Sequence, residues 1–334
     1  MLAPIASTSN ETKPMTRVNI KAIGSAFALG GLLLAGCNQY NGPVENFTDT
    51  PTSGAISISV DETFEPILKS QIDTFQKLYP SARITATYKP EEEVMQDLLA
   101  NKIRVAVVSR QLNATEQAEF DRLKIVPRTA RLATDGLAIV VHPSNPDSLL
   151  TVSKLRDIFT GKTQEWAQVS GKQGLGSINV VFDTNHSSTT RYVQDSLTRG
   201  SALTKRVFAA KSNPALLDYV ATHPNAIGII GVNWISDRDD AEVQGFLKKV
   251  RIVGISAQPN PQSSDDYLQP YQAYLALKTY PLRREVYLIS REARAGLGTG
   301  FASFAAGNKG QLIVLKSGLV PATGQMRIID TNKR

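Results

Sequence analysis

The sequence predicts an α/β protein folded as two lobes with a cleft between them. Segments with the apolar patterns of strands alternate with segments of helical spacing along most of the chain, which favours a largely parallel sheet. The 334 residues exceed what one compact core usually needs, which favours two lobes. Short polar groups follow three of the strands, where ligands of open α/β sheets bind.

The first 36 residues have the pattern of a secretory signal. Three basic residues, the last of them Lys21, precede the apolar run 22–35, which is short for a membrane span. The run ends in Leu34-Ala35-Gly36-Cys37, which resembles the bacterial lipobox. We therefore expect residues 1–36 to be removed and Cys37 to be lipid-modified, so that the exported chain is anchored to the cell envelope on its periplasmic side. The alternative is a transmembrane helix with an incidental cysteine.

A flexible tether is expected between this anchor and the folded body. Residues 37–53 are rich in Asn, Gly, Pro, Thr and Ser and lack periodicity. Cys37 is the only cysteine, so the mature chain has no internal disulfide and no thiolate metal site. The hydrophobic content of 42% and net charge of +7 are ordinary for a folded protein. Without a block of consecutive basic residues, nucleic-acid binding is poorly supported.

The folded part begins with strands and helices in alternation. The apolar alternation of 55–60 predicts a strand, and residues 64–79 have helical spacing. Residues 83–88 and 105–108 predict two further strands, separated by a helix that begins at Glu91-Glu92-Glu93. These glutamates suit the positive end of the helix dipole, and we expect a solvated first turn.

A second set of predicted strands and helices follows, from residue 137 to residue 315. The predicted strands are 137–141, 178–182, 226–232, 250–255 and 286–289. The predicted helices are 155–166, which is broken at Gly161, a segment around 203–208, 215–222 and 301–315. No internal sequence repeat accompanies this alternation.

The stretch 178–197 points most directly to a binding site. A buried strand ends in a polar turn, and Ser187-Ser188-Thr189-Thr190 stand where a helix begins. Free N–H groups and the positive end of the dipole suit an anion there, although Ser and Thr are also ordinary helix caps. Asp61-Glu62-Thr63 and Ser109-Arg110 follow two other strands. Three such strand ends favour one cleft, in which Arg110 and Arg191 are candidates to hold an oxyanion.

The sequence offers little support for catalysis. The three histidines, His142, His186 and His223, have no metal-ligand spacing with one another. Neither a nucleophile elbow nor a Walker loop occurs. His186 beside Ser187 is conceivable as base and nucleophile, but sequence neighbours seldom face each other in that way. We therefore expect no enzyme activity, no metal and no cofactor. A surface hydrolase or phosphatase is the alternative.

Several segments between Ala55 and Pro321 occur in the order and spacing of a known family. They are Glu62-Thr63-Phe64, Val107-Val108-Ser109, Asp135-Gly136-Leu137-Ala138-Ile139-Val140-Val141, Ile158-Phe159-Thr160-Gly161-Lys162 with Trp166, Asn225-Ala226-Ile227-Gly228-Ile229, Tyr280-Pro281-Leu282-Arg283-Arg284, Gly310-Gln311 and Gly318-Leu319-Val320-Pro321. In these segments the chain resembles the phosphate-binding proteins of bacterial phosphate ABC transporters, which are type II periplasmic binding proteins.

The resemblance implies two α/β lobes, joined by two crossing strands, that enclose a dehydrated anion. It assigns the crossings to 137–141 and 286–289, the first lobe to 54–136 with 285–330, and the second lobe to 137–284. It also implies a monomer that delivers phosphate or a related oxyanion to the permease of an ABC transporter. Another oxyanion is the alternative ligand within this class.

The resemblance also maps anion contacts onto both lobes. Those of the first lobe are Thr63, the Phe64 N–H and Ser109, and those of the second are Ser187, Ser188 and Thr189. Arg110 stands where the family has an Asp, and Asp183 stands where it has an Arg. We expect this exchanged pair to face each other across the closed cleft, with Arg110 donating to the anion. Asp183 would orient Arg110 or accept the proton of a hydrogen-bearing oxyanion. In addition, Pro90-Glu91-Glu92-Glu93 replaces a helix start rich in Gly and Ser.

The lipid anchor can be tested through Cys37. Because acylation needs the cysteine sulfur, Cys37→Ala should leave the protein unprocessed or release it from membranes. Membrane fractionation of cells that express each form measures this, and normal membrane retention of processed Cys37→Ala would contradict the assignment.

Overall fold

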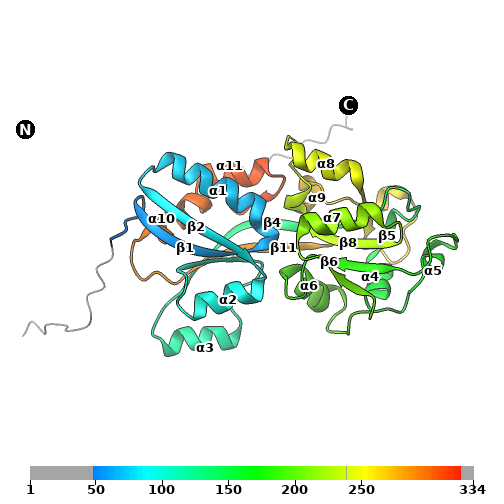
Figure 1. Ribbon diagram of the computed structural model, residues 1–334, viewed down its shortest axis with the longest axis horizontal. Helices are drawn as coiled ribbons and strands as arrows, with labels where there is room; N and C mark the ends of the chain where they lie inside the picture. Colours follow the sequence, from blue (N-terminus) through cyan, green and yellow to red (C-terminus); the bar gives the residue numbers. More distant parts are fainter. Residues whose placement is uncertain (1–47, 238, 325–334) are drawn as a thin grey trace, which may run out of the picture. The chain divides into compact units, whose positions relative to one another are not determined.

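The computed structural model describes residues 48–237 and 239–324, which form two α/β lobes connected by paired strands (Figure 1). The expected signal segment, Cys37 and most of the expected tether lie outside the described residues. Within these ranges the structure holds no helix with the length and apolar character that a membrane crossing requires.

The first lobe is built on three parallel strands with helices on both faces. Its strands are β1 (Gly54–Asp61), β2 (Ala82–Lys89) and β3 (Val105–Val108), in the order β2-β1-β3. Its helices are η1 (Glu62–Phe64), α1 (Glu65–Leu78), α2 (Glu91–Leu99), α3 (Ala114–Arg122), α10 (Leu297–Ala306) and α11 (Asn308–Lys316). In Figure 1, α1 and α11 lie on one face of this sheet and α2 and α3 on the other.

The short strand β3 shows why helices cover both faces. All four of its side chains are buried. Val105 and Val107 belong to the large core cluster that includes residues of α1 and α10, whereas Ala106 and Val108 belong to a smaller cluster with residues of α2 and α3. Successive side chains of a strand point to opposite faces, so an uninterrupted apolar run requires a core on each side.

The second lobe repeats this construction around β8, β6 and β7. Its strands are β5 (Leu149–Thr151), β6 (Asn179–Phe182), β7 (Val207–Ala209), β8 (Ala226–Gly231), β9 (Arg251–Ile252) and β10 (Gly254–Ser256). Its helices are α4 (Val152–Phe159), α5 (Ala167–Ser170), α6 (Ser188–Tyr192), the π-helix η2 (Val193–Leu197), α7 (Asn213–Thr222), η3 (Val232–Trp234), α8 (Ala241–Lys249), η4 (Ser264–Asp266) and α9 (Gln272–Ala276).

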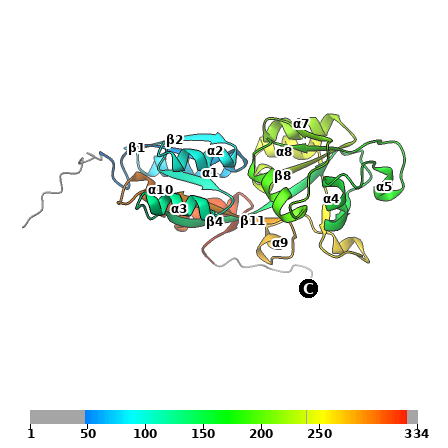
Figure 2. The same ribbon diagram turned by 90° about the horizontal axis from the view of Figure 1, so that it is seen from below.

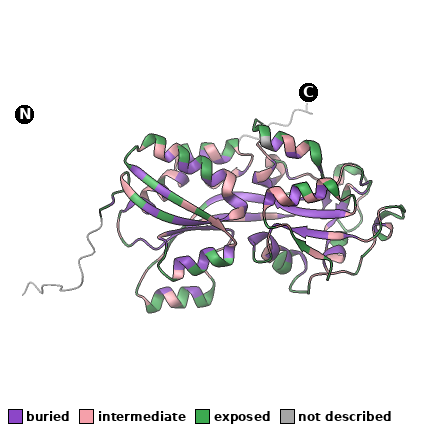
Figure 3. Ribbon diagram, viewed as in Figure 1, coloured by how far each residue is buried: buried purple, intermediate pink, exposed green. Residues whose placement is uncertain are grey.

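Two antiparallel strands, β4 (Arg128–Val141) and β11 (Arg283–Ser290), connect the lobes (Figure 2). Up to Gly136, β4 pairs with β11, and from Leu137 onward it pairs with β8. The strand is thus a member of both sheets, with β12 (Val320–Pro321) and β9 pairing along its length. Every side chain from Leu132 to Val141 is buried (Figure 3).

Three helices expected from the sequence differ in the structure, and one of them, expected at 155–166, begins at Val152 and ends at Phe159. The helix expected around 203–208 is wrong, because this segment leads into β7, which pairs with β6. Pairing with a distant strand outweighs the local apolar spacing there. The helix expected at 301–315 is divided into α10 and α11, with Gly307 extended between them. The two helices pass so closely that a Cβ on Gly310 would lie 2.5 Å from the Phe304 carbonyl oxygen.

Candidate functional site

Thr63 lies where the first lobe contacts the second. The Asp61 carboxylate caps η1 by accepting from the Thr63 N–H at 3.0 Å. The carbonyl oxygen of Thr63 accepts from Asn233 Nδ2 at 2.7 Å and from Trp234 Nε1 at 2.9 Å, both on η3 of the second lobe. Thr63 Oγ1 lies 3.4 Å from Ser188 Oγ and 3.5 Å from Asp183 Oδ2. Thr63 therefore contacts the second lobe through both main chain and side chain.

The facing segment is the junction of β6 and α6. Ser187 caps α6 by accepting from the Thr190 N–H at 3.1 Å, and its hydroxyl donates to Asp183 Oδ1 at 2.6 Å. Asp183 Oδ1 also accepts from the Thr184 N–H at 2.9 Å. Ser188 and Thr189 are fully buried. The three hydroxyl residues predicted from the sequence thus stand at this helix start, with Ser188 adjacent to Thr63.

Arg284 of β11 is a central side chain of the site that the sequence analysis did not single out. It is only 5% exposed, and its Nε donates to Asp135 Oδ2 at 2.9 Å, across the paired strands. Its Nη1 donates to Ser188 Oγ at 2.8 Å, and its guanidinium carbon lies 4.8 Å from the Phe64 ring centroid. The available signal was weak, because β11 also carries Arg283 and Glu285, which flank Arg284 along the strand and are not buried.

Several buried polar atoms around this cluster have no hydrogen-bond partner within the described part of the chain. They are Asp61 Oδ2, Asp135 Oδ1, Thr189 Oγ1, Asn233 Oδ1 and Arg284 Nη2. Native proteins rarely leave such atoms unsatisfied, so the cluster has the donors and acceptors to hold a small polar molecule. Gly231 permits the close approach, because a Cβ there would lie 2.6 Å from Thr63 Cγ2 and 3.1 Å from Arg284 Nη2.

A second cluster joins the lobes through Glu91. The expectation of a solvated first turn is wrong for this residue, which is 2% exposed, whereas Glu92 and Glu93 are exposed. Glu91 Oε1 accepts from the N–H and Oγ of Ser109 at 2.7 and 2.9 Å. Its Oε2 accepts from Nε of Arg191 at 2.5 Å. Donors from both lobes therefore hold the Glu91 carboxylate in the interior.

Arg110 and Asp183 have other partners than each other. Both terminal nitrogens of Arg110 donate to Glu116, at 2.7 and 2.8 Å, and its Nε lies 3.7 Å from Glu91 Oε2. Glu116 belongs to the capping box of α3, so a local helix start supplies the carboxylate for Arg110. Asp183 instead faces Thr63 and Ser187. Arg110 and Asp183 thus belong to two separate sets of contacts and do not pair with each other.

The buried carboxylates differ in charge state. Burial and the nearby Glu91 raise the pKa of Asp61 to about 7, against the opposing effect of Arg284. Burial likewise raises the pKa of Asp135 and of Asp183 above the usual value. Burial alone would raise the pKa of Glu91, but Arg191 and the Ser109 donors lower it below its usual value. Glu91 is therefore an anion at neutral pH, whereas Asp61 readily holds a proton.

The PBP superfamily domain model matches residues 46–309. The chain belongs to the PBP superfamily. This membership and the observed lobes confirm the expected two-lobed type II periplasmic-binding fold.

Individual relatives of this PBP-superfamily protein include the phosphate-binding protein PstS of Staphylococcus epidermidis, 21% identical over 274 residues that cover 81% of this chain and 78% of that protein. A Clostridium perfringens substrate-binding protein of the phosphate ABC transporter type, with bound phosphate, aligns with a TM-score of 0.68 at 22% identity, covering 81% of this chain and all of that one. An ABC-type phosphate transport receptor from Vibrio cholerae gives 0.60 at 22% identity, with coverage of 80% and 100%. The expected resemblance to this class of proteins is confirmed.

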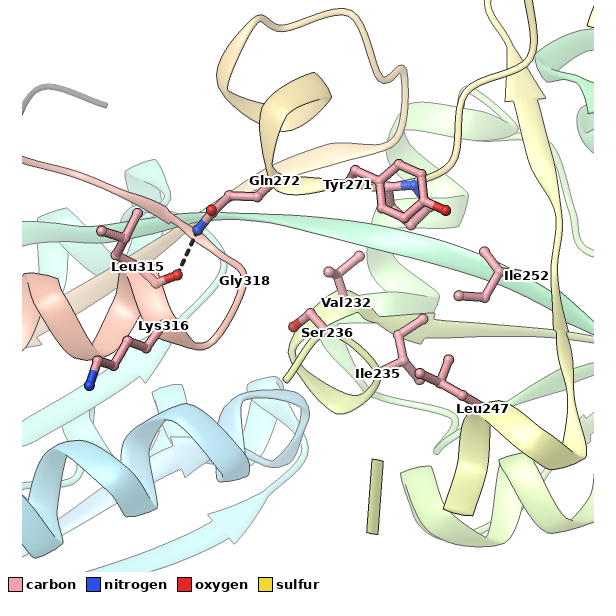
Figure 4. Close-up of a pocket in the computed structure, with 11 residues that line it drawn as sticks. Val232, Ile235, Ser236, Leu247, Ile252, Tyr271, Gln272, Leu315, Lys316 and Gly318 are labelled. Carbon is pink, nitrogen blue, oxygen red and sulfur yellow. Dashed lines mark hydrogen bonds between the residues drawn. The ribbon is translucent and has the colours of Figure 1, made fainter. Parts of the chain in front are cut away.

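Two hollows differ in their relation to the site. One of about 280 Å³ is lined largely by apolar side chains of η3, α8 and the segments around α9 and α11 (Figure 4). It contains none of the predicted ligand contacts. Another, of about 250 Å³, is lined by residues of the Glu91 cluster and its neighbours: Glu91, Glu92, Arg110, Asn185, His186, Ser187, Arg191 and Gln194. Only the second gives a polar approach to the candidate site.

The raised pKa of Asp61 has a consequence for stability. In the folded state the pKa is about 7 and the ordinary value is 3.8, so between these values the folded protein holds a proton that the unfolded chain has lost. The contribution of Asp61 to the free energy of unfolding therefore falls as the pH rises through this window. We predict a higher Tm at pH 5 than at pH 8, measured by calorimetry. Asp61→Asn keeps a capping side chain and should reduce the difference, and an equal difference in this variant would contradict the assignment.

Proposed function

We propose that the protein is an exported, monomeric solute-binding protein that captures phosphate, or a related hydrogen-bearing oxyanion, and delivers it to the permease of an ABC transporter. In this proposal Cys37 carries the lipid anchor that holds the protein to the cell envelope. The observation that supports the ligand best is the buried cluster of Thr63, Ser188, Thr189 and Arg284. Within the described residues, Thr189 Oγ1 of the second lobe and Arg284 Nη2 of the connecting strand have no hydrogen-bond partner, and neither has the neighbouring Asp61 Oδ2 of the first lobe. The named relatives, which bind phosphate according to their descriptions, support the same ligand class.

The chemistry of the cluster favours an anion that carries a proton. Arg284 and the hydroxyls of Ser188 and Thr189 are donors for the oxygens of an anion. Asp183 is a buried carboxylate close to these donors, and its oxygens can accept from a hydrogen-bearing oxyanion. A fully deprotonated dianion such as sulfate has no hydrogen to offer and would leave a buried carboxylate unsatisfied. We therefore propose Thr63, Phe64, Ser109, Arg110, Asp183, Ser187, Ser188 and Thr189, together with Arg284 and with Arg191 beside Ser109, as the ligand site.

The hydrolase alternative has less support from the same geometry. His186 Nδ1 lies 3.1 Å from Glu92, while the Ser187 hydroxyl donates to Asp183, so the two neighbours have separate partners. In the described ranges, groups of three or more His, Cys, Asp or Glu side chains suited to a metal are absent. Among the described residues, His186 therefore does not face the Ser187 hydroxyl as a base. Turnover of a chromogenic phosphoester, at a rate that follows the protein through purification, would favour the hydrolase.

The Thr189 hydroxyl provides a direct test of ligand binding. It is buried and has no hydrogen-bond partner among residues 48–237 and 239–324, so Thr189→Val should leave folding unchanged while removing one donor to the ligand. Loss of one hydrogen bond to a charged group is worth about 1.5–3 kcal/mol, or tenfold and more in affinity. Titration calorimetry with orthophosphate measures this, with the exposed Ser196→Ala as control. Wild-type affinity in Thr189→Val would remove Thr189 from the site.

Asp183 tests the selectivity of the site. If its carboxylate accepts the ligand proton, Asp183→Asn should lower the ratio of phosphate to sulfate affinity, because an amide donates equally to either anion. Competition between the two anions measures this ratio, and circular dichroism checks that the variant is folded. An unchanged affinity ratio in a folded variant would show that Asp183 does not accept a hydrogen bond from the protonated oxygen of the ligand.

A further inference from the structure

We infer that Glu91 is a built-in anion that holds the lobes closed and competes with the ligand for Ser109 and Arg191. The inference rests on the proposed function, since it takes the ligand to be an anion. It makes Glu91 a residue that determines how tightly, and in which state of the lobes, the protein binds that ligand.

The contacts of the Glu91 carboxylate are those of an oxyanion captured between two lobes. From the first lobe, the N–H and hydroxyl of Ser109 donate to Oε1 at 2.7 and 2.9 Å. From the second lobe, Arg191 donates to Oε2 through Nε at 2.5 Å, and its Nη2 lies 3.4 Å from Oε1. The same Nη2 donates to Ser109 Oγ at 2.8 Å. Both donors of Ser109, an expected ligand contact, are therefore already engaged by a protein carboxylate.

Glu91 accepts its shortest hydrogen bonds from donors of both lobes, Ser109 on the first and Arg191 on the second. Asp61 Oδ1 accepts from the Thr63 N–H of its own lobe, and Asp183 accepts from Thr184 and Ser187 of its own lobe at 2.9 and 2.6 Å. Asp183 reaches Thr63 of the other lobe only at 3.5 Å. Opening the cleft would leave the contacts within each lobe intact but would break the pair of Glu91 with Arg191. The ion pair between Glu91 and Arg191 therefore forms only when the two lobes are closed on each other.

Arg191 has the surroundings needed to leave Glu91. Its side chain is 33% exposed, and its Nη1 also lies 3.3 Å from Asp195 of its own lobe. The hollow of about 250 Å³ adjoins both members of the pair and is open to Arg110 and His186 as well. An anion that enters there meets the donors that hold Glu91. Because the buried carboxylate and the incoming anion need the same donors, one must displace the other.

Removing the charge of Glu91 tests both of its proposed roles, which are to hold the lobes closed and to compete with the ligand. In Glu91→Gln the amide retains the size of the side chain and an oxygen for Ser109, but its NH₂ group cannot accept from Arg191. We expect the ligand-free variant to have a larger radius of gyration than the ligand-free wild type in small-angle scattering. We also expect it to bind orthophosphate about tenfold more tightly, because the internal competitor is gone. Glu93→Gln, which removes the same charge from an exposed position in the same helical turn, should match the wild type in both measurements.

Arg191→Gln provides a second variant at a partly exposed position. It should also enlarge the ligand-free radius, but it should weaken phosphate binding, because it removes a donor instead of a competitor. A folded Glu91→Gln with the wild-type radius and no gain in phosphate affinity would overturn the inference. If no form binds phosphate, the proposed ligand fails, whereas the ligand-free radii still decide whether Glu91 holds the lobes closed.

Discussion

The ion pair between Arg284 and Asp135 is the interaction on which the site depends. It joins the two connecting strands, β11 and β4, at the point where they pass between the lobes, and both side chains are buried. A buried charge that loses its partner typically destabilises a protein by about 3–5 kcal/mol. Arg284 uses a further nitrogen to contact Ser188 of the second lobe. The connection between the lobes and the floor of the candidate site therefore share one guanidinium group.

Buried carboxyl groups surround the Arg284 guanidinium, so the site contains acceptors as well as donors for an anion. Asp61, Asp135 and Asp183 surround Arg284 in the interior, and burial raises the pKa of each. Such carboxylates serve as proton carriers or as acceptors, and either role suits a ligand that brings hydrogens of its own. By contrast, Arg191 and the Ser109 donors lower the pKa of Glu91, so the pKa values of the buried carboxyl groups in this cleft are shifted in opposite directions.

The sequence predicted the features that local pattern determines. The alternation of strands and helices predicted that Thr63, Ser109 and Ser187 follow the ends of strands. In the structure they follow β1, β3 and β6, because the carboxyl ends of parallel strands lie at the same edge of a sheet. Glu91 was not foreseen as buried, because a glutamate in the first turn of a helix has the same local pattern whether solvent or Arg191, 100 residues away, surrounds it. Arg284 was quoted only as part of a matching segment, since its partner lies 149 residues away. Arg110 was assigned by position along the chain, whereas the nearby capping box of α3 determines its partner.

The strand β4 has a consequence for how the protein loses its structure. Since it pairs with β11 in the first sheet and with β8 in the second, neither sheet can separate from it without exposing backbone groups and apolar side chains of the other. The lobes are thus not independent folding units joined by a linker, because the same strand supplies hydrogen bonds and buried side chains to both. Thermal unfolding is expected to be one cooperative transition, in which damage to either core spreads to the other through a single shared strand.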